Sequence, residues 1–372
     1  MAIFSAVVFS MALMDSPLPF THRTRSFRSI VSCTGCIIQN KLLWQRWPNQ
    51  YCPEQKPQLE KADSYPLITV VIPTYNRASL LKKAIGSVLD QTYNNLELII
   101  ADDGSTDDTK QVVGSIGDPR IKWIGLPHTG HIGNVRNAGA RAGKGKWIAF
   151  LDSDDQWLSD KLELQLEAVK TTGKRWCYTN FELMNEMGMK IPPRAGSYKP
   201  LSGWITGQLL SNEATVIVCT LLLEKKLFDE IEGFSMDERL AFRGDYEFAL
   251  RLSLKDEAVA LPHILVKVLE HPGRATNSLP DAHERSAVPY VVFLEQNNEA
   301  AFRKIAKKRQ AHLLAEAAVR RSATGDRRMA LGQLVKAMGD DDWRHWLSAA
   351  YRSMKGAFRL NRKYKIDGYP DL

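Results

Sequence analysis

The sequence is short of cysteine and has no long apolar run. Its 372 residues include five cysteines, an odd and scattered set that argues against a disulfide framework and indicates a reducing compartment. Cys33 and Cys36 have the spacing of a zinc or redox pair, but no second pair accompanies them, so we favour unpaired thiols. The apolar residues 1–14 are fewer than the roughly 20 residues that a membrane span needs, and they lack the positive start of a secretory signal. These absences favour a cytoplasmic protein.

Several ligand-binding signatures are also absent. No G-x-x-x-x-G-K-[S/T] or G-x-G-x-x-G loop follows the first predicted strand, which weakens any interpretation as an ATP- or dinucleotide-binding protein. No zinc finger or aromatic–basic RNA motif supports nucleic-acid binding. The net charge of +8 nevertheless favours anionic partners. Charge alone leaves nucleotides, acidic glycans and an anionic membrane face as candidates.

The chain divides into three regions. Residues 1–64 form an irregular N-terminal arm, because prolines recur in it and break any long helix. Residues 65–280 alternate apolar, β-branched strands with helical patterns; the first four predicted strands are residues 67–72, 96–101, 121–124 and 147–151. Such alternation predicts an α/β fold with a doubly wound, mostly parallel, Rossmann-like sheet. In such sheets ligands bind at the carboxyl ends of the strands.

The pattern is looser after residue 200. We expect a strand at residues 216–223, a helix at 224–231 and a helix that opens with Gly244 and Asp245. Earlier, Ser159 is placed to cap the helix that follows the fourth strand. Residues 281–372 form a basic helical region. Its basic face could rest on an anionic membrane, but a helical bundle packed on the core is the favoured alternative.

Three carboxylates follow the fourth predicted strand, at Asp152, Asp154 and Asp155. Their repulsion is costly unless a positive charge offsets it. Mg²⁺ and Mn²⁺ prefer oxygen ligands and bridge to phosphates, so a divalent cation is one explanation. The alternative is an acidic helix start.

Two further clusters follow the first and second strands. Pro73 stiffens the exit of the first strand, and Tyr75 offers a flat face on which a base can stack. Asp103, after the second strand, could accept hydrogen bonds from a base N–H or from ribose hydroxyls. Ordinary turns, one of them with a helix cap, would explain the same residues.

Together these segments resemble the family 2 glycosyltransferases, which are inverting enzymes of the GT-A fold. The matching segments are residues 70–76, 101–107, 134–139 and 150–155. The resemblance extends over roughly residues 67–275, and the combination is highly specific. It implies a nucleotide-sugar donor and a divalent metal, Mn²⁺ or Mg²⁺.

The resemblance also assigns roles on the donor side. Pro73 and Tyr75 match residues that line the base pocket, and Asp103 matches the carboxylate that recognises the base. Arg136 matches an arginine near the donor's phosphates or sugar; its alternative role is a surface ion pair. His271 matches a basic segment near the diphosphate, where the family often has Arg-x-His. That arginine is missing here, Arg274 is a candidate substitute, and an exposed turn histidine is the alternative.

Metal and base assignments follow in the same way. Asp152 and Asp154 match the two acids of the family's DxD motif, with Asp154 as the direct metal ligand and Asp155 as its assistant. An inverting reaction needs a base that takes the proton of the acceptor hydroxyl. The resemblance gives this role to Asp245, although Gly244 stands where the family usually has Glu. A helix cap is the alternative, and Asp237 and Glu238 are the fallback carboxylates.

The resemblance therefore implies an inverting enzyme that moves a single sugar from a nucleotide-sugar donor, with UDP favoured. The acceptor would be a glycan, lipid-linked or other cell-envelope molecule. Processive synthases of the superfamily carry Gln-x-x-Arg-Trp and several membrane helices, and we find neither. The alternatives are a nucleotidylyltransferase of similar fold and an inactive relative that binds nucleotide or acts as a scaffold. We expect a cytoplasmic location, with peripheral contact at the inner face of the membrane as an option, and no nucleic-acid partner.

Overall fold

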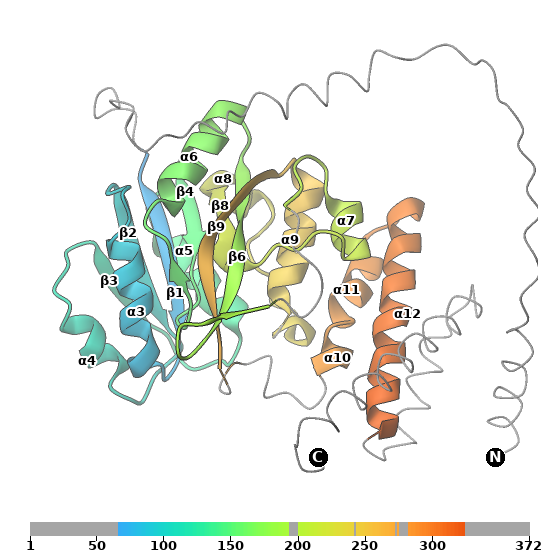
Figure 1. Ribbon diagram of the computed structural model, residues 1–372, viewed down its shortest axis with the longest axis horizontal. Coiled ribbons are helices and arrows are strands. Elements are labelled where there is room, and N and C mark those ends of the chain that lie inside the picture. Colours follow the sequence, from blue (N-terminus) through green and yellow to red (C-terminus); the bar gives the residue numbers. More distant parts are fainter. Residues whose placement is uncertain (1–65, 193–199, 242, 272–273, 275–281, 324–372) are drawn as a thin grey trace, which may run out of the picture. The chain divides into compact units, whose positions relative to one another are not determined.

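The computed structural model describes residues 66–192, 200–241, 243–271, 274 and 282–323 (Figure 1). These residues belong to one compact unit, Ala62–Leu372. The predicted arm of residues 1–64 and the helices predicted beyond residue 323 lie outside the described residues. The boundaries of the three predicted regions therefore stay predictions.

The described strands form a single mixed sheet. They are β1 (Ile68–Thr74), β2 (Leu96–Asp102), β3 (Ile121–Gly125), β4 (Trp147–Phe150), β5 (Gln156–Trp157), β6 (Trp176–Asn185), β7 (Lys190–Ile191), β8 (Leu221–Glu224) and β9 (Val259–Glu270). Their order is β3-β2-β1-β4-β8-β6-β9-β5, with β7 paired to β6. The four strands predicted for the first half are present within one or two residues of the expected bounds.

Six strands run in one direction. β1, β2, β3 and β4 pair in parallel. β8 is antiparallel to both β4 and β6, so β6 runs the same way as β4. β9 is parallel to β6. The carboxyl ends of these six strands therefore lie along one side of the sheet, which we call the carboxyl edge. The predicted α/β fold with a mostly parallel sheet is confirmed.

Helices cover both faces of the sheet. Every residue of β1 and β2 is buried, as expected for strands that are covered on both sides. One hydrophobic cluster includes α3 (Ala78–Leu89), α4 (Thr109–Gly114) and α6 (Lys161–Thr172). The other includes α5 (Ile132–Ala142), α7 (Thr206–Ser211), α8 (Lys225–Glu230) and α9 (Gly244–Lys255). This is the doubly wound arrangement, and Figure 1 shows α3 and α6 on one side of the strands and α9 on the other.

A glycine fixes the distance between α5 and the sheet. Gly139 lies in α5, and a Cβ atom at this position would overlap the side chain of Val71 in β1. Only glycine permits such a close approach of a helix to a strand. The close packing places the first turn of α5 directly beside the carboxyl edge.

Two local predictions are wrong. Ser159 does not cap α6: the position before the helix is Asp160, without a side-chain cap. Instead, Gln91 Oε1, at the end of α3, accepts a hydrogen bond from Leu162 N–H at 3.0 Å, so a residue distant in sequence satisfies this helix start. The predicted strand at 216–223 is shorter, because residues Val218–Thr220 form a 3₁₀ turn before β8 begins.

The described part of the predicted helical region, residues 281–372, is helical. They are α10 (Ala282–Arg285), α11 (Val288–Gln296) and α12 (Ala300–Ala323). Some of their buried side chains, among them Phe293 and Ala306, belong to the same hydrophobic cluster as α9. Among the residues that the structure describes, no helix combines the length and the apolarity that crossing a membrane requires. Location and peripheral membrane contact stay predictions.

Candidate active site

The predicted site residues gather along the carboxyl edge because of the strand directions. Pro73 is the second-last residue of β1, and Tyr75 is the first residue after this strand. Asp103 follows β2, Asp152 lies two residues after the end of β4, and His271 follows β9. Since β1, β2, β4 and β9 run the same way, these side chains share one edge of the sheet.

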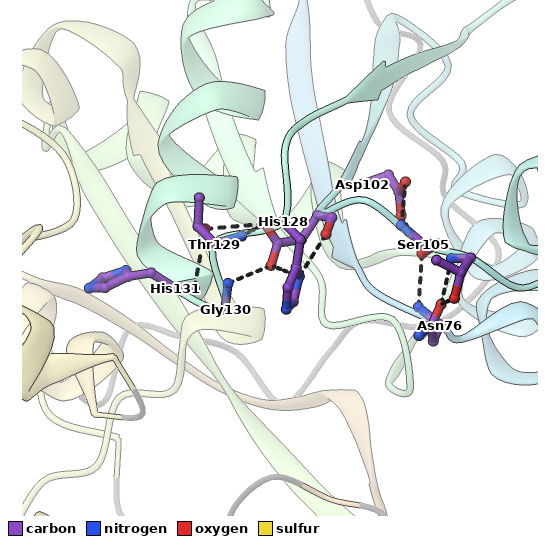
Figure 2. Close-up of polar contacts among 9 residues, drawn as sticks. Asn76, Asp102, Ser105, His128, Thr129, Gly130 and His131 are labelled. Atoms are coloured by element: carbon purple, nitrogen blue, oxygen red, sulfur yellow. Dashed lines mark hydrogen bonds and ion pairs between the residues drawn. The ribbon is translucent and has the colours of Figure 1, made fainter.

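Tyr75 and Asp103 are held beside the loop that follows β3. Tyr75 is 41% exposed, and its ring stacks on His128 with the centroids 4.2 Å apart. Asp103 Oδ1 accepts hydrogen bonds from the N–H and the hydroxyl of Thr129, at 3.0 and 3.1 Å. Asp103 Oδ2 accepts from Gly130 N–H at 2.9 Å and lies 3.0 Å from His128 Nδ1. Figure 2 shows His128, Thr129 and Gly130 together in this loop.

Other polar residues join the loop after β1 to the loop after β2. Asn76 N–H donates to Ser105 Oγ at 2.8 Å, and Asn76 Oδ1 accepts from Thr106 N–H at 2.8 Å (Figure 2). Ser105 also donates to Asp102. Asp107 accepts from Ala78 N–H, at the start of α3. Asn76, Ser105 and Asp107 thus make structural contacts between the loops, whereas Tyr75 and Asp103 face the loop after β3.

A short segment links the two sides of the carboxyl edge: the nucleobase side, with Tyr75 and Asp103, and the acidic side, with Asp152 and Asp154. Asn76 bonds to the loop after β2, and its neighbour Arg77 reaches Asp154, with Nη1 3.9 Å from Oδ2. The predicted base pocket and the predicted metal site are thus connected by consecutive residues. We did not assign a role to Arg77 from the sequence.

Each carboxylate of the acidic cluster has a distinct environment. Asp152 Oδ1 accepts a hydrogen bond from Arg136 Nη2 at 2.6 Å, and Arg136 is 3% exposed. Asp154 Oδ2 lies 3.0 Å from His271 Nε2. His271 is 7% exposed, which excludes the alternative of an exposed turn histidine. The buried position of Arg136 likewise excludes a surface ion pair.

Asp155 lies in the interior. It is 2% exposed, and its Oδ1 accepts a hydrogen bond from Leu269 N–H in β9 at 3.1 Å. Burial, followed by the charges of Asp152 and Asp154, raises the pKa of the Asp155 carboxyl well above its usual range. Its assignment as an assisting ligand stays a prediction.

Positive charge surrounds the same cluster. Arg274 follows His271, and its N–H donates to the His271 carbonyl at 3.1 Å. Burial lowers the pKa of the Arg274 guanidinium, but Asp155, Glu270 and Asp154 outweigh it and raise that pKa. The Arg274 guanidinium is paired with Glu270, and its role as a substitute for the missing arginine stays a prediction. Together with Arg77 and Arg136, Arg274 can face an anionic ligand at the edge.

Asp154 and His271 offer one carboxylate oxygen and one imidazole nitrogen to a cation. In the described part of the chain, no group of three or more His, Cys, Asp or Glu side chains is arranged to hold a metal. Mg²⁺ usually has only one or two protein carboxylates and completes its shell with water and substrate phosphates. The pair therefore fits a cation that is shared with a diphosphate, and it does not fit a closed structural metal site.

Asp245 lies in the first turn of α9. This helix ends near the amino end of β6, where Trp176 Nε1 donates to the Asp256 carbonyl at 3.0 Å, so it begins near the carboxyl edge. Asp245 is not the cap residue of α9, which is Arg243. A Cβ atom at Gly244 would meet nothing within 4 Å, so packing does not explain why Glu is missing there.

The fallback carboxylate Asp237 is a weaker candidate base. Its Oδ1 accepts from Arg239 N–H at 2.9 Å and caps a short 3₁₀ turn. The hydrogen-bonded guanidinium of Arg239 lowers the pKa of the Asp237 carboxyl. A carboxylate with a lowered pKa accepts a proton less readily. Of Asp245 and Asp237, Asp245 is therefore the preferred candidate.

A cavity of about 180 Å³ opens beside Asp154. It lies between α3, β5 and the turn that joins β6 to β7, and its walls include Lys83, Gln156, Asn185 and Glu186. The turn between β6 and β7 thus supplies part of the cavity wall.

Comparison with known proteins agrees with this geometry. The model of the glycosyl transferase family 2 matches residues 69–231. The uncharacterized glycosyltransferase RT0329 of Rickettsia typhi is 30% identical over 244 residues, which are 63% of this chain and 74% of that protein. The chain belongs to glycosyl transferase family 2. Family membership removes the nucleotidylyltransferase alternative.

Other relatives of this family 2 protein match shorter stretches. UDP-Glc:alpha-D-GlcNAc-diphosphoundecaprenol beta-1,3-glucosyltransferase WfgD of Escherichia coli is 35% identical over 142 residues. This match spans 37% of the family 2 chain and 56% of WfgD, little more than half of the relative. The crystal structure of S. aureus TarS 1-349 in complex with UDP-GlcNAc has a TM-score of 0.56 at 16% identity. It covers 78% of this chain and 92% of TarS 1-349, and it supports the GT-A type fold.

Proposed function

We propose that this family 2 protein is an inverting glycosyltransferase that moves one sugar from a UDP-sugar to a lipid-linked acceptor of the cell envelope. The name of WfgD describes a glucosyltransferase that uses UDP-glucose and a diphosphoundecaprenol-linked acceptor. The observation that carries the proposal is the arrangement of the carboxyl edge. Tyr75 and Asp103 lie on its base side, Asp154 and His271 lie on its acidic side, and Asn76 and Arg77 join the two.

The donor would lie along this edge. A base can stack on Tyr75 and donate an N–H to Asp103, and aromatic faces and charged acceptors are suited to those contacts. The diphosphate would then reach the acidic side. There Arg77 and Arg274 offset the charge that develops on the leaving nucleotide.

Asp154 and His271 would hold the divalent cation. A bound divalent cation supplies Lewis-acid stabilisation of the diphosphate leaving group. Arg136 fixes one oxygen of Asp152, so Asp152 is oriented by the protein before any ligand arrives. Such preorganised charges cost no rearrangement during the reaction.

Asp245 would act as the general base. The acceptor hydroxyl attacks the anomeric carbon from the face opposite the nucleotide, and its proton passes to the Asp245 carboxylate. Tyr246, the next residue, fixes the start of α9, because its hydroxyl bonds to the Leu209 carbonyl at 2.6 Å and to the Tyr290 hydroxyl at 2.7 Å. Contacts with α7 and α11 thus fix the start of the helix that carries the proposed general base.

Removal of the Asp154 carboxylate tests the proposal. We expect Asp154→Asn to lower the Mn²⁺-dependent release of UDP from UDP-glucose by a factor of about 100 or more, because one preorganised electrostatic group is worth that much. Excess EDTA should abolish the release by the wild type. Exposed Glu167, on α6, gives the matched control Glu167→Gln, which should behave as wild type. Release at the protein-free background in both wild type and Asp154→Asn would show that the protein is an inactive relative, and equal release above that background would show that Asp154 does not hold the cation.

A further inference from the structure

His128 makes both contacts that the proposed donor site offers to a nucleobase: a stack on Tyr75 and a bond to Asp103. Its ring stacks on Tyr75 with centroids 4.2 Å apart and planes at 19°. The separation of the rings leaves no room for a base between them. A base that stacks on this face of Tyr75 must therefore take the place of the His128 ring.

The same histidine is bonded to Asp103. His128 Nδ1 lies 2.9 Å from the Asp103 carbonyl oxygen and 3.0 Å from Asp103 Oδ2. Both atoms are acceptors, so Nδ1 carries a hydrogen and donates it. The ring thus presents a flat aromatic face to Tyr75 and a ring N–H to Asp103. A pyrimidine with a ring N–H would present the same two groups.

His128 covers the remaining acceptor position of the Asp103 carboxylate, with Nδ1 3.0 Å from Oδ2. A carboxylate accepts about four hydrogen bonds. Thr129 supplies two donors, Gly130 supplies one, and His128 faces the fourth position. Two of these donors are backbone N–H groups, which cannot leave unless the loop moves. The His128 side chain is 48% exposed, and rotation about its own bonds can release it.

We propose that the His128 ring occupies the base position in the free protein and gives way to a base that brings its own N–H to Asp103. The proposal rests on the donor site proposed above. Uracil (N3–H) and guanine (N1–H) carry a ring N–H and can replace the lost hydrogen bond. The corresponding ring nitrogen of cytosine is an acceptor and would face the carboxylate without a hydrogen. His128 thus competes equally with every base, and the Asp103 carboxylate distinguishes a base with a ring N–H from one without it.

Calorimetric titration of UDP and CDP in the presence of Mn²⁺ tests this proposal. Because the competing ring is absent from His128→Ala, we expect this variant to bind UDP about tenfold more tightly than the wild type, the combined effect of one stack and one hydrogen bond. His128→Phe keeps the stack and loses the N–H, so its affinity should lie between the two. The preference for UDP over CDP should stay the same in His128→Ala, because displacement of the His128 ring costs the same for either base. Exposed His263 gives the control His263→Ala, which should behave as wild type.

The outcomes separate the two proposals. Equal or weaker UDP binding by His128→Ala, while Tyr75→Ala loses UDP binding, overturns the role of His128 and leaves the donor site in place. Absence of UDP binding by the wild type, or full binding by Tyr75→Ala, overturns the donor site and the role of His128 with it. A second readout is the ring proton resonance of His128, which the stacked Tyr75 ring shifts upfield. Saturation with UDP should move it towards the position of an unstacked histidine, and no movement would contradict the displacement.

Discussion

At the scale of single residues, the environment of Asp245 separates it from the other carboxylates. Asp155 is buried and its pKa is raised, and the Asp237 carboxylate is engaged by Arg239. Asp245 lies in the first turn of α9 and accepts a hydrogen bond from the Tyr246 N–H at 2.9 Å. Its carboxylate is partly exposed, so it can meet an acceptor hydroxyl.

Replacement of Asp245 by asparagine isolates the proton-transfer role. We expect Asp245→Asn to lower kcat by about 10² to 10⁴, the usual contribution of a general base, and to leave the affinity for UDP unchanged. Glycosyl transfer to an acceptor and calorimetric UDP binding measure the two effects separately. Glu167→Gln again serves as the control. A variant with wild-type kcat would return the role to Glu238 or Asp237.

The residues of the site divide into those that local sequence identifies and those that only the fold reveals. Tyr75, Asp103 and Asp154 follow apolar strands, and their position relative to the strand is visible in the sequence. His128, Arg77 and Leu269 reach the site through contacts between segments distant in sequence. His128 has a usable signal, because it too follows the end of a strand, β3, but its neighbours Thr129 and Gly130 are equally typical of an ordinary turn.

At the scale of secondary-structure elements, predictability depended on how local the cause is. β1 and β2 were predictable because each is a continuous apolar run buried on both faces. β6, by contrast, was not identified: its ten residues mix buried and half-buried positions, and its pairing with β8 and β9 is long-range. The start of α6 depends on Gln91, which no local capping rule includes.

The same helix carries a fully buried lysine. Lys161 is 0% exposed, and its Nζ donates to Gln165 Oε1 at 2.6 Å and lies 4.0 Å from the centre of the Trp157 ring. Burial lowers the pKa of its ammonium group to about 7, against a smaller opposing effect of Cys177 and Cys219. No carboxylate is among the groups that shift this pKa, so burial disfavours the charged form of Lys161 in the folded state.

This lysine predicts how stability depends on pH. Between its folded pKa of about 7 and its ordinary value of 10.5, the unfolded chain binds the proton and the folded chain does not. Stability therefore rises with pH above 7, by about 1–2 kcal/mol between pH 7 and 8.5. Urea unfolding should show this rise in the wild type and not in Lys161→Met, apart from a background common to both. The exposed-site variant Lys110→Met should keep the wild-type slope. A wild-type minus Lys161→Met difference that stays constant with pH would mean that Lys161 remains charged in the folded state.

At the scale of the whole molecule, the C-terminal helices share a hydrophobic cluster with α9, the helix that carries Asp245. Phe293 and Tyr290 of α11 belong to the same hydrophobic cluster as Phe248 of α9 and Leu209 of α7. Arg239, in the segment before α9, also bonds to Glu295 of α11 at 2.9 Å. A bundle packed on the core was the favoured alternative from the sequence, and the described helices adopt it. The helix that carries Asp245 is therefore braced by residues beyond the segment that the family model matches.

Shared packing predicts that α11 and the sheet unfold together. Phe293 is 4% exposed, and Phe293→Ala should cost about 3–5 kcal/mol, as large-to-small changes in a core do. Calorimetry should show one main transition whose Tm falls, and UDP should raise the Tm of the variant as it does that of the wild type. Trp204→Ala removes an aromatic ring of larger size that is 60% exposed, so its Tm should stay close to that of the wild type. Phe293→Ala could instead lower only a separate minor transition, while the UDP-responsive transition keeps its Tm. In that case α11 would fold independently of the catalytic core and would not stabilise the helix that carries Asp245.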